Sequence, residues 1–385
     1  MRYSTFQLQD VCSFIDYRGK TPPKTASGIP LVTAKIVKNG TIQEPQEFIA
    51  TSYYDEWMRR GIPKKGSVIF TTEAPLGEVA RIRTEDKLAF AQRIIILEPN
   101  LNRLDADYLF YALQDEVLKC RIGARATGTT VIGIKAAELK KVNIDLPPLP
   151  EQTAIAAVLS ALDDKIELNN RINQKLEEMA QAIFDELYIT FVDESPFTSV
   201  IQILGGGTPK TGNSDYWNGC IPFFTPKDVG NPYTLKTEKY ISESGLNGCN
   251  SRLYPENTVF VTARGTVGKV SLSGTPMAMN QSCYALIGKD KLGQFMTYHL
   301  TLKTINSLKN KANGAVFDAI VTRDFDTEMI RTPTEKQSEE FQRAVTPIYD
   351  RILLNSKENV NLNNLRDTLL PKLMSGELRV PCDSE

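Results

Sequence analysis

The sequence predicts an α/β protein with two α/β domains in a pseudo-twofold arrangement, separated by two long antiparallel coiled-coil helices. Three observations predict it. The 385-residue chain contains an internal sequence repeat of two units. Two segments show the apolar spacing of long paired helices, and the remaining segments contain short runs of β-branched residues. We expect domain 1 over residues 1–150, a helix over 151–190, domain 2 over 191–334 and a helix over 335–378.

The internal repeat is visible by direct comparison of the two halves, at an offset that drifts from about 192 to about 186 residues. Residues 29–35 read IPLVTAK and residues 221–227 read IPFFTPK. Residues 68–72 likewise parallel residues 259–263. At a constant offset of 186, Asp164, Ile166, Leu168, Asn169, Asn173 and Leu176 recur as Asp350, Ile352, Leu354, Asn355, Asn359 and Leu362. Such self-similarity indicates one structural unit in each half.

Both helical segments follow proline, which suits the first turn of a helix: Pro150 precedes the first segment and Pro333 the second. Apolar residues then alternate at spacings of four and three, the pattern of a coiled-coil seam over about four to five heptads. The seam positions are Ile155, Leu159, Leu162, Ile166, Asn169, Asn173, Leu176, Ala180, Ile183 and Leu187, then Phe341, Val345, Ile348, Ile352, Asn355, Asn359, Leu362, Arg366, Leu369 and Leu373.

Four asparagines in the seam predict how the helices pair. If the helices run antiparallel, Asn169 meets Asn359 and Asn173 meets Asn355. A polar pair inside an apolar seam lowers stability but specifies register and orientation. The alternative is that these side chains face solvent or a partner protein.

The net charge of −1 hides an uneven distribution. Residues 151–195 carry a net charge of −7 and residues 335–385 carry −2, whereas residues 1–150 and 196–334 carry +4 each. Two mildly basic blocks therefore alternate with two acidic ones, which fits two domains that face DNA and two segments that face something else. A charge of +4 does not by itself establish DNA binding.

Each domain combines short β-branched or aromatic runs, such as residues 93–97 and 258–262, with one helical stretch, near residues 107–119 and 293–310. Basic and amide residues gather on the expected loops. Arginine can bond guanine in two places, asparagine or glutamine can do so for adenine, and lysine more often holds phosphate. The candidate DNA-binding residues are Lys20, Lys24, Lys35, Gln92, Arg93, Arg121, Arg125, Lys210, Lys227, Arg264, Asn280, Gln281, Lys309, Lys311 and Arg323.

For each single candidate the alternative is an ordinary solvated surface charge. The candidates at equivalent repeat positions are better supported, and these are the pairs Lys24 and Lys210, Lys35 and Lys227, and Gln92 and Gln281. They could equally be scaffold residues of the repeat.

The sequence contains no grouping typical of a metal or cofactor site. The six cysteines form no CxxC pair and His299 is the single histidine, whereas zinc needs about four clustered ligands. Residues 205–209 read GGGTP and lack the GxxxxGK[ST] pattern of a phosphate loop. We therefore expect reduced thiols, no metal and no cofactor.

Sequence patterns also argue against catalysis and a membrane location. An adenine methyltransferase would need an [Asn/Asp]-Pro-Pro-aromatic loop and a glycine-rich cofactor turn, and residues 145–148 (DLPP) are not that loop. No apolar run approaches the roughly 18–20 residues of a membrane span, and residues 1–10 lack a secretory signal. We expect a cytoplasmic protein without catalytic activity of its own.

The order of domain, long helix, domain and long helix resembles the specificity (S) subunit family of type I restriction–modification systems. The residues that carry the resemblance span nearly the whole chain: 207–210 (GTPK), the Ile-Pro pairs at Ile29 and Ile221, 146–152 (LPPLPEQ) and 369–378 (LLPKLMSGEL). The second helix enters through residues 332–337 (TPTEKQ) rather than the fuller proline motif, which leaves the details of that entry open.

The resemblance implies two target-recognition domains that each read one half of a split site in double-stranded DNA. It also implies that the helices act as a ruler and as docking surfaces for two methyltransferase (M) subunits, which restriction (R) subunits can join. Two alternatives stay open: a coiled-coil adaptor that binds only proteins, and the specificity subunit of a related system whose methylase and nuclease share one polypeptide.

Overall fold

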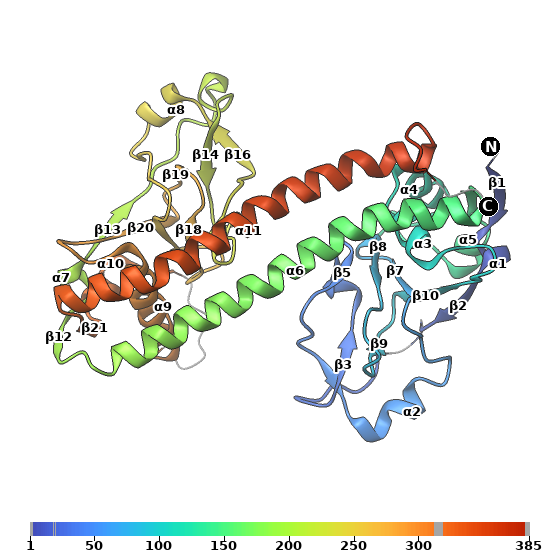
Figure 1. Cartoon of the computed structure of the whole chain (residues 1–385), viewed down its shortest axis with the longest axis horizontal. Coiled ribbons are helices and arrows are strands. Elements are labelled where there is room, and N and C mark those ends of the chain that lie inside the picture. Colours follow the sequence, from blue (N-terminus) through green and yellow to red (C-terminus); the bar gives the residue numbers. More distant parts are fainter. Residues whose placement is uncertain (1–2, 18, 20, 312–318, 382–385) are drawn as a thin grey trace. The chain divides into compact units, whose positions relative to one another are not determined.

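The computed structural model describes residues 3–17, 19, 21–311 and 319–381. The chain divides into unit 1, comprising Met1–Lys165 and Leu362–Glu385, and unit 2, comprising Ile166–Asn361. Both units mix helices and strands, and two long helices, α6 (Leu149–Tyr188) and α11 (Glu335–Ser375), contribute to both (Figure 1). Over the described ranges, none of the helices combines the length and apolarity that crossing a membrane would need.

Unit 1 is built on a four-stranded antiparallel sheet, with smaller sheets around it. The main sheet has the order β2 (Cys12–Asp16), β10 (Ile94–Pro99), β7 (Val68–Thr72) and β8 (Leu76–Arg81). The smaller sheets are β6 (Phe48–Ile49), β3 (Ile29–Val32) and β9 (Ala89–Phe90); β1 (Ser4–Gln7) and β11 (Asn143–Leu146); and β4 (Val37–Lys38) and β5 (Thr41–Ile42). Its short helices are α1 (Leu8–Val11), α2 (Tyr54–Trp57), α3 (Ala106–Ala112), α4 (Glu116–Gly123) and α5 (Ala136–Lys140), with 3-10 turns at Ala34–Ile36 and Thr51–Tyr53.

The main sheet of unit 1 is buried on both faces. Successive side chains on a strand point to opposite faces, so Val68 and Phe70 belong to one core cluster and Ile69 to another. The first cluster includes Leu159 of α6 and Leu373 of α11, which places the ends of the long helices against that face of the sheet. Domain 1 is therefore packed directly on both helices.

Unit 2 repeats this plan with a five-stranded sheet in the order β13 (Ile201–Gly205), β20 (Cys283–Gly288), β17 (Val259–Thr262), β18 (Val270–Ser273) and β15 (Tyr233–Thr234). The smaller sheets are β16 (Lys239–Ile241), β14 (Ile221–Phe224) and β19 (Ala278–Met279), and β12 (Asp193–Pro196) with β21 (Met329–Thr332). Its helices are α7 (Phe197–Val200), α8 (Glu243–Asn247), α9 (Gln294–Lys311) and α10 (Thr322–Asp326), with a 3-10 turn at Ser214–Tyr216.

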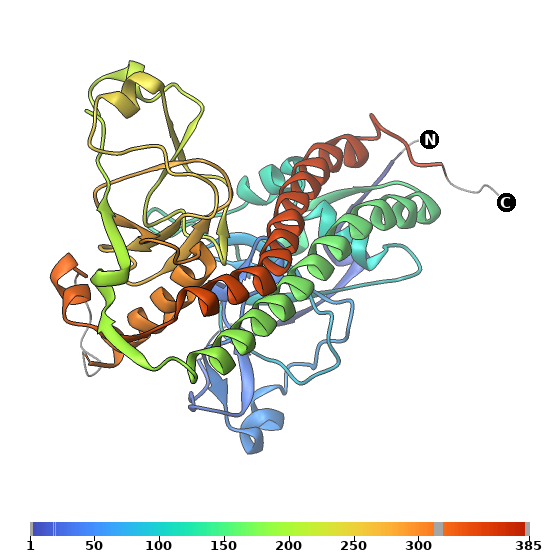
Figure 2. The ribbon, with the colours of Figure 1, turned by 60° about the vertical axis from the view of Figure 1, so that its left-hand side comes forward.

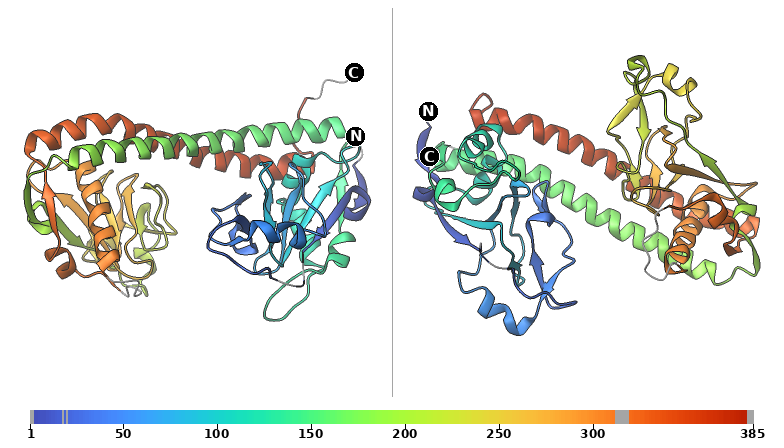
Figure 3. Two further views of the ribbon diagram at one scale, coloured as in Figure 1. Left: turned by 90° about the horizontal axis from the view of Figure 1, so that it is seen from below. Right: turned by 180° about the vertical axis from the view of Figure 1, so that it is seen from behind.

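Helix α9 runs alongside the unit 2 sheet and reaches the long helices (Figure 3). Its residues Phe295 and Met296 share a cluster with Val259 of the sheet and with Phe184 and Phe341 of the long helices. The small sheet that contains β14, together with α8, lies on the side of unit 2 away from the long helices (Figure 2). The far side of each main sheet is thus left to short strands and connecting loops.

The repeated sequence motifs occupy equivalent strands. The order β2-β10-β7-β8 in unit 1 matches β13-β20-β17-β18 in unit 2. In each unit the strand that begins with the Ile-Pro motif pairs in parallel with a two-residue strand, β3 with β9 and β14 with β19. The internal duplication is therefore a duplication of topology as well as of sequence.

One expected helix is wrong in detail. The stretch near residues 107–119 forms two helices, α3 and α4, rather than one. The side chain of Asp115 accepts a hydrogen bond from the Val117 amide at 3.1 Å and starts α4, as an N-cap does. In unit 2 the corresponding stretch is the single helix α9.

Candidate nucleic-acid interface and its attachment to the helices

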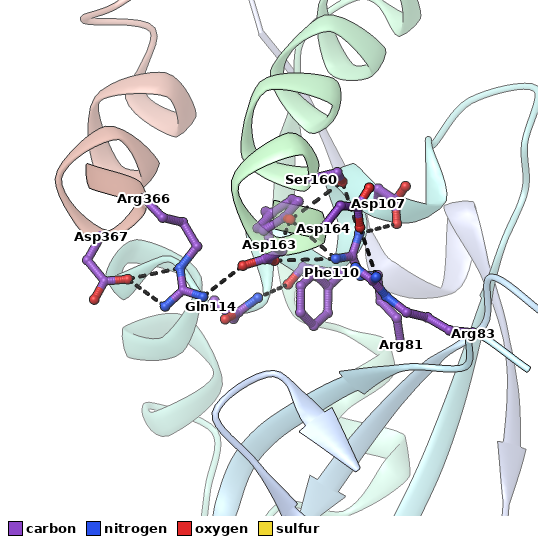
Figure 4. A network of polar contacts seen from close by, with 11 residues as sticks. Arg81, Arg83, Asp107, Phe110, Gln114, Ser160, Asp163, Asp164, Arg366 and Asp367 are labelled. Carbon is purple, nitrogen blue, oxygen red and sulfur yellow. Dashed lines mark hydrogen bonds and ion pairs between the residues drawn. The ribbon is translucent and has the colours of Figure 1, made fainter. Parts of the chain in front are cut away.

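In unit 1 a network of charged side chains joins the sheet of domain 1 to both long helices (Figure 4). Arg81, at the end of β8, donates to Asp107 at 2.6 Å and lies 3.3 Å from Oδ2 of Asp163 on α6. Arg366 on α11 donates to Oδ1 of the same aspartate at 2.8 Å. One carboxylate of α6 therefore bridges a guanidinium of the sheet and a guanidinium of the other helix.

This network is largely shielded from water. The side chain of Arg81 is 7% exposed and that of Asp163 is 14% exposed, so salt screens their attraction much less than that of a surface pair. The Arg81 guanidinium also lies 4.4 Å from the centre of the Phe110 ring. Burial raises the pKa of Tyr111 above its ordinary value, so its hydroxyl remains a donor to Asp163, at 2.6 Å.

In unit 2 the positions equivalent to Asp163 and Arg366 carry uncharged residues. At the offset of 186, Tyr349 takes the place of Asp163 and Ala180 that of Arg366. The Tyr349 hydroxyl lies 2.9 Å from Nε2 of His299, whose Nδ1 lies 3.1 Å from Oε1 of Gln181. Burial lowers the pKa of His299 to about 3, so the ring is neutral at pH 7 and Tyr349 donates to it.

The asparagines of the seam face one another within unit 2. Asn355 donates to Asn173 at 2.8 Å, and Asn169 donates to Asn359 at 2.8 Å. Asn169 also donates to Glu358, and all of Asn169, Asn173 and Asn355 are buried. The two pairs expected from the sequence therefore meet by hydrogen bonds, in the antiparallel sense. Their role in specifying register remains a proposal.

Most basic candidates of domain 1 lie beside carboxylates. Ion pairs join Lys24 to Glu47 at 2.8 Å, Arg93 to Glu73 at 2.8 Å, Arg121 to Asp145 at 2.6 Å and Arg125 to Glu138 at 3.0 Å. Lys35 and Gln92 are exposed, and Lys20 lies outside the described residues. Exposed ion pairs contribute little free energy, so Lys24 and Arg93 can exchange a carboxylate for phosphate, whereas the ion pairs of Arg121 and Arg125 are half-buried.

The structure brings two of the domain 1 candidates together. Gln92 and Arg93 form the turn between β9 and β10 and line a cavity of about 300 Å³ with Thr127 and Lys135. Gln281 occupies the same turn of unit 2, between β19 and β20, and accepts a hydrogen bond from Thr208. The glutamines of the repeat therefore share one position in the fold.

The remaining candidates of domain 2 fall into two groups. Lys210, Arg264 and Arg323 are exposed, Lys227 is exposed with Glu238 at 3.9 Å, and Asn280 is half-buried. Lys309 and Lys311 instead make contacts internal to unit 2: Lys309 donates to the Gly268 carbonyl at 2.8 Å and Lys311 to the buried Glu328 at 2.6 Å. These two contacts hold the end of α9 against the rest of unit 2.

Two features escaped the sequence reasoning. The Arg81–Asp163–Arg366 network joins residues from three distant segments. Arg366 stands out as a charged residue at a seam position, but nothing local marks Arg81 and Asp163 as its partners. The loop at residues 127–133 exposes Val131 and Ile132, although apolar residues of this kind are usually buried. The sequence does contain a sign of this loop, because glycines mark turns and Gly128 and Gly133 lie near its two ends.

Comparisons with known proteins agree with the duplicated architecture. Residues 2–178 and 192–364 match the type I restriction modification DNA specificity domain. The chain is 24% identical over 383 residues to the type I restriction enzyme MjaIX specificity subunit of Methanocaldococcus jannaschii, covering 91% of this chain and 87% of that protein. It is also 24% identical over 399 residues to the HindI specificity subunit of Haemophilus influenzae, covering 82% and 87%.

A solved structure shares the fold. The crystal structure of the type I restriction–modification system S subunit from M. genitalium aligns with a TM-score of 0.59 at 16% identity, over 97% of this chain and 96% of the other. A DNA specificity domain in each half decides against an adaptor that binds only proteins. The chain therefore belongs to the family of type I restriction–modification DNA specificity subunits, which supply sequence recognition rather than catalysis.

Proposed function

We propose that residues 1–150 and 191–334 are two target-recognition domains, each of which reads one half of an asymmetric bipartite site in double-stranded DNA. The observation that carries this proposal is the shared position of Gln92 and Gln281 in the same turn of a duplicated sheet. The domains share topology while their other loop residues differ, since Arg93 of one turn is replaced by Ser282 in the other. Because the two domains share a topology but differ in their loop residues, we expect them to recognise different half-sites.

The residues proposed to face DNA are Lys24, Lys35, Gln92, Arg93, Arg121 and Arg125 in domain 1, and Lys210, Lys227, Arg264, Asn280, Gln281 and Arg323 in domain 2. Glutamine and asparagine can read adenine and arginine can read guanine, while lysine positions the phosphate backbone. We propose that this DNA recognition takes place in the cytoplasm, where the partner subunits also act.

We further propose that the long helices bind two methyltransferase subunits, one on each helix. Leu168 of α6 is 48% exposed and Leu354 of α11, at the equivalent repeat position, is 57% exposed. Met179 is exposed three helical turns after Leu168, on the same helix face. An exposed apolar surface that the repeat provides twice fits two copies of one partner.

The mass of the assembled complex, measured by native mass spectrometry, tests the stoichiometry. Leu168→Asp and Leu354→Asp are each expected to remove one methyltransferase subunit, and the double variant to remove both. Gln174→Asp, at an exposed position on another face of α6, is expected to keep both subunits. Retention of two subunits by the double variant would contradict docking at these leucines.

Methylome sequencing of the host with and without this gene tests the recognition proposal. Deletion is expected to abolish methylation at one bipartite, asymmetric motif, and a plasmid copy is expected to restore it. The expected result is the same whether the partners are separate methyltransferase and restriction subunits or a fused methylase–nuclease. In both cases the specificity subunit selects the DNA sequence that is methylated. A methylome that is the same in both strains would refute the proposal.

A further inference from the structure

We infer that the loop at residues 127–133 of domain 1 reads DNA through the apolar side chains of Val131 and Ile132, which contact thymine methyl groups in the half-site of that domain. This inference rests on the proposed function, because it names the groups with which domain 1 distinguishes bases.

The loop is held in one shape. Its two ends are joined by a pair of backbone hydrogen bonds, from the Thr127 amide to the Gly133 carbonyl at 2.8 Å and from the Gly133 amide to the Thr127 carbonyl at 3.0 Å. Gly128 has a φ of +129°, and a Cβ at that position would lie 2.0 Å from the Val131 carbonyl oxygen. Only glycine fits there, so the chain reverses sharply and presents residues 129–132 to solvent.

The loop is also anchored to the main sheet of unit 1. The amide of Ile134, a buried residue, donates to the Thr72 carbonyl at the end of β7 at 2.9 Å. Gly133 pairs with Glu73, and a Cβ on this glycine would lie 2.9 Å from the Cβ of Glu73. The Thr72 amide in turn donates to the Arg93 carbonyl at 2.9 Å. The loop and the turn that carries Gln92 and Arg93 are therefore both hydrogen-bonded to the same end of β7.

The tip of the loop is apolar and unburied. Val131 is 49% exposed and Ile132, the next residue, is 59% exposed. Two neighbouring β-branched apolar side chains on a rigid, projecting loop contribute little to the stability of unit 1. Adjacent apolar side chains that stay exposed and are bordered by polar groups are available to contact a partner.

The surroundings of the loop favour DNA as the occupant. The cavity of about 300 Å³ at its base is lined by Gln92, Arg93, Thr127 and Lys135. Among the described residues that line this cavity, the one carboxylate is that of Glu73, which Arg93 neutralises at 2.8 Å. Amide, hydroxyl and cationic groups beside an apolar tip match the major groove, where base edges, phosphates and thymine methyl groups are presented together.

Replacing thymine by uracil tests the inference directly, since it removes a single methyl group from the DNA. The complex of this chain with its methyltransferase partner is titrated with duplexes that carry deoxyuridine at one position of the site at a time. Loss of one buried methyl, worth about 0.8 kcal/mol, is expected to weaken binding about fourfold. We expect this loss at one or more positions of the domain 1 half-site for the unaltered chain.

The double variant Val131→Ser/Ile132→Ser is expected to bind thymine and uracil duplexes equally well, because it lacks the apolar contact. The matched control is Leu101→Ser, which removes an exposed apolar side chain elsewhere in unit 1 and is expected to keep the uracil effect. Substitutions of uracil in the other half-site are expected to act equally on all three proteins.

Each alternative result has a defined meaning. The inference is overturned if uracil in the domain 1 half-site does not weaken binding by the unaltered chain. It is also overturned if uracil weakens binding by the double variant as well. In either case a bipartite motif still supports the proposed function. A double variant that no longer assembles with the methyltransferase would assign the loop to a protein interface. If the methylated motif is the same with and without this gene, the proposed function is wrong, and the inference that rests on it is wrong with it.

Discussion

Asp163 of α6 accepts a hydrogen bond of 2.8 Å from Arg366 of α11 and lies 3.3 Å from Arg81 of the domain 1 sheet. Removing the charge of this aspartate leaves two guanidinium groups without their shared counter-ion. We expect Asp163→Asn to lower the free energy of unfolding by about 3 kcal/mol, as breaking a buried ion pair does. Urea denaturation followed by circular dichroism measures the change.

The next residue provides a matched control. Asp164 pairs with Arg83 at 2.8 Å, but both side chains are exposed, at 62% and 40%. Asp164→Asn is therefore expected to cost less than about 1 kcal/mol. Equal effects of the two variants would show that the buried Arg81–Asp163–Arg366 network does not stabilise unit 1 more than the exposed pair drawn beside it (Figure 4).

The neutral, buried His299 predicts a pH dependence of stability. Burial lowers its pKa to about 3 in the folded chain, whereas the pKa in the unfolded chain is about 6.5. Between these values only the unfolded chain binds the proton, so the free energy of unfolding falls by about 1.4 kcal/mol per pH unit as the pH drops below 6.5, and this contribution is intact above 6.5.

His299→Gln, which cannot titrate, isolates that contribution. The free energy of unfolding of both proteins is measured by denaturation between about pH 6 and pH 4.5. Its dependence on pH is expected to be less steep for the variant, by the amount that corresponds to one bound proton. Identical slopes would mean that His299 is protonated in the folded chain.

The paired asparagines predict the effect of lengthening a helix. Four residues inserted after Asn170 add about 6 Å, or nearly two base pairs at about 3.4 Å each, and keep close to one full helical turn. We expect a longer nonspecific spacer in the methylated motif, unchanged half-sites and some loss of stability as Asn169 and Asn173 lose their partners. An active variant with an unaltered spacer would mean that the helices do not set the distance between the half-sites.

Catalysis is expected to require a partner. The purified chain should neither bind S-adenosylmethionine nor methylate DNA, because it carries no loop for a flipped base and no cofactor turn. Calorimetry with the cofactor and a radiolabel assay measure both, and activity should appear on addition of the methyltransferase subunit. Methylation by the chain alone would contradict the assignment.

The long helices could be predicted from the sequence because their signals are local. The expected segments 151–190 and 335–378 correspond to Leu149–Tyr188 and Glu335–Ser375. The seam is right at Asn169 and Asn173, but near the end of α6 the structure buries Phe184 rather than Ile183. A repeat of 3.5 residues drifts against a helix of 3.6 residues per turn, which moves the seam by one position.

The sheets and the interface could be predicted only in part, because strand pairing and side-chain partners depend on distant residues. Strand β1 pairs with β11 from the opposite end of domain 1, which no short-range pattern marks. Residue type alone could not show that Lys309, although exposed, donates to a backbone carbonyl of unit 2. The same limit applies to Val131 and Ile132, since apolar residues usually lie inside.

The exchange of one domain tests the central claim most directly. Residues 1–150 are replaced by the corresponding domain of a related specificity subunit, and the methylated motif is mapped in a host that supplies the partner subunits. Because each domain is a complete unit of the duplication, with its own sheet and loops, we predict that one half of the motif changes and the other half is retained. A motif that changes in both halves, or in neither, would contradict recognition by two independent domains.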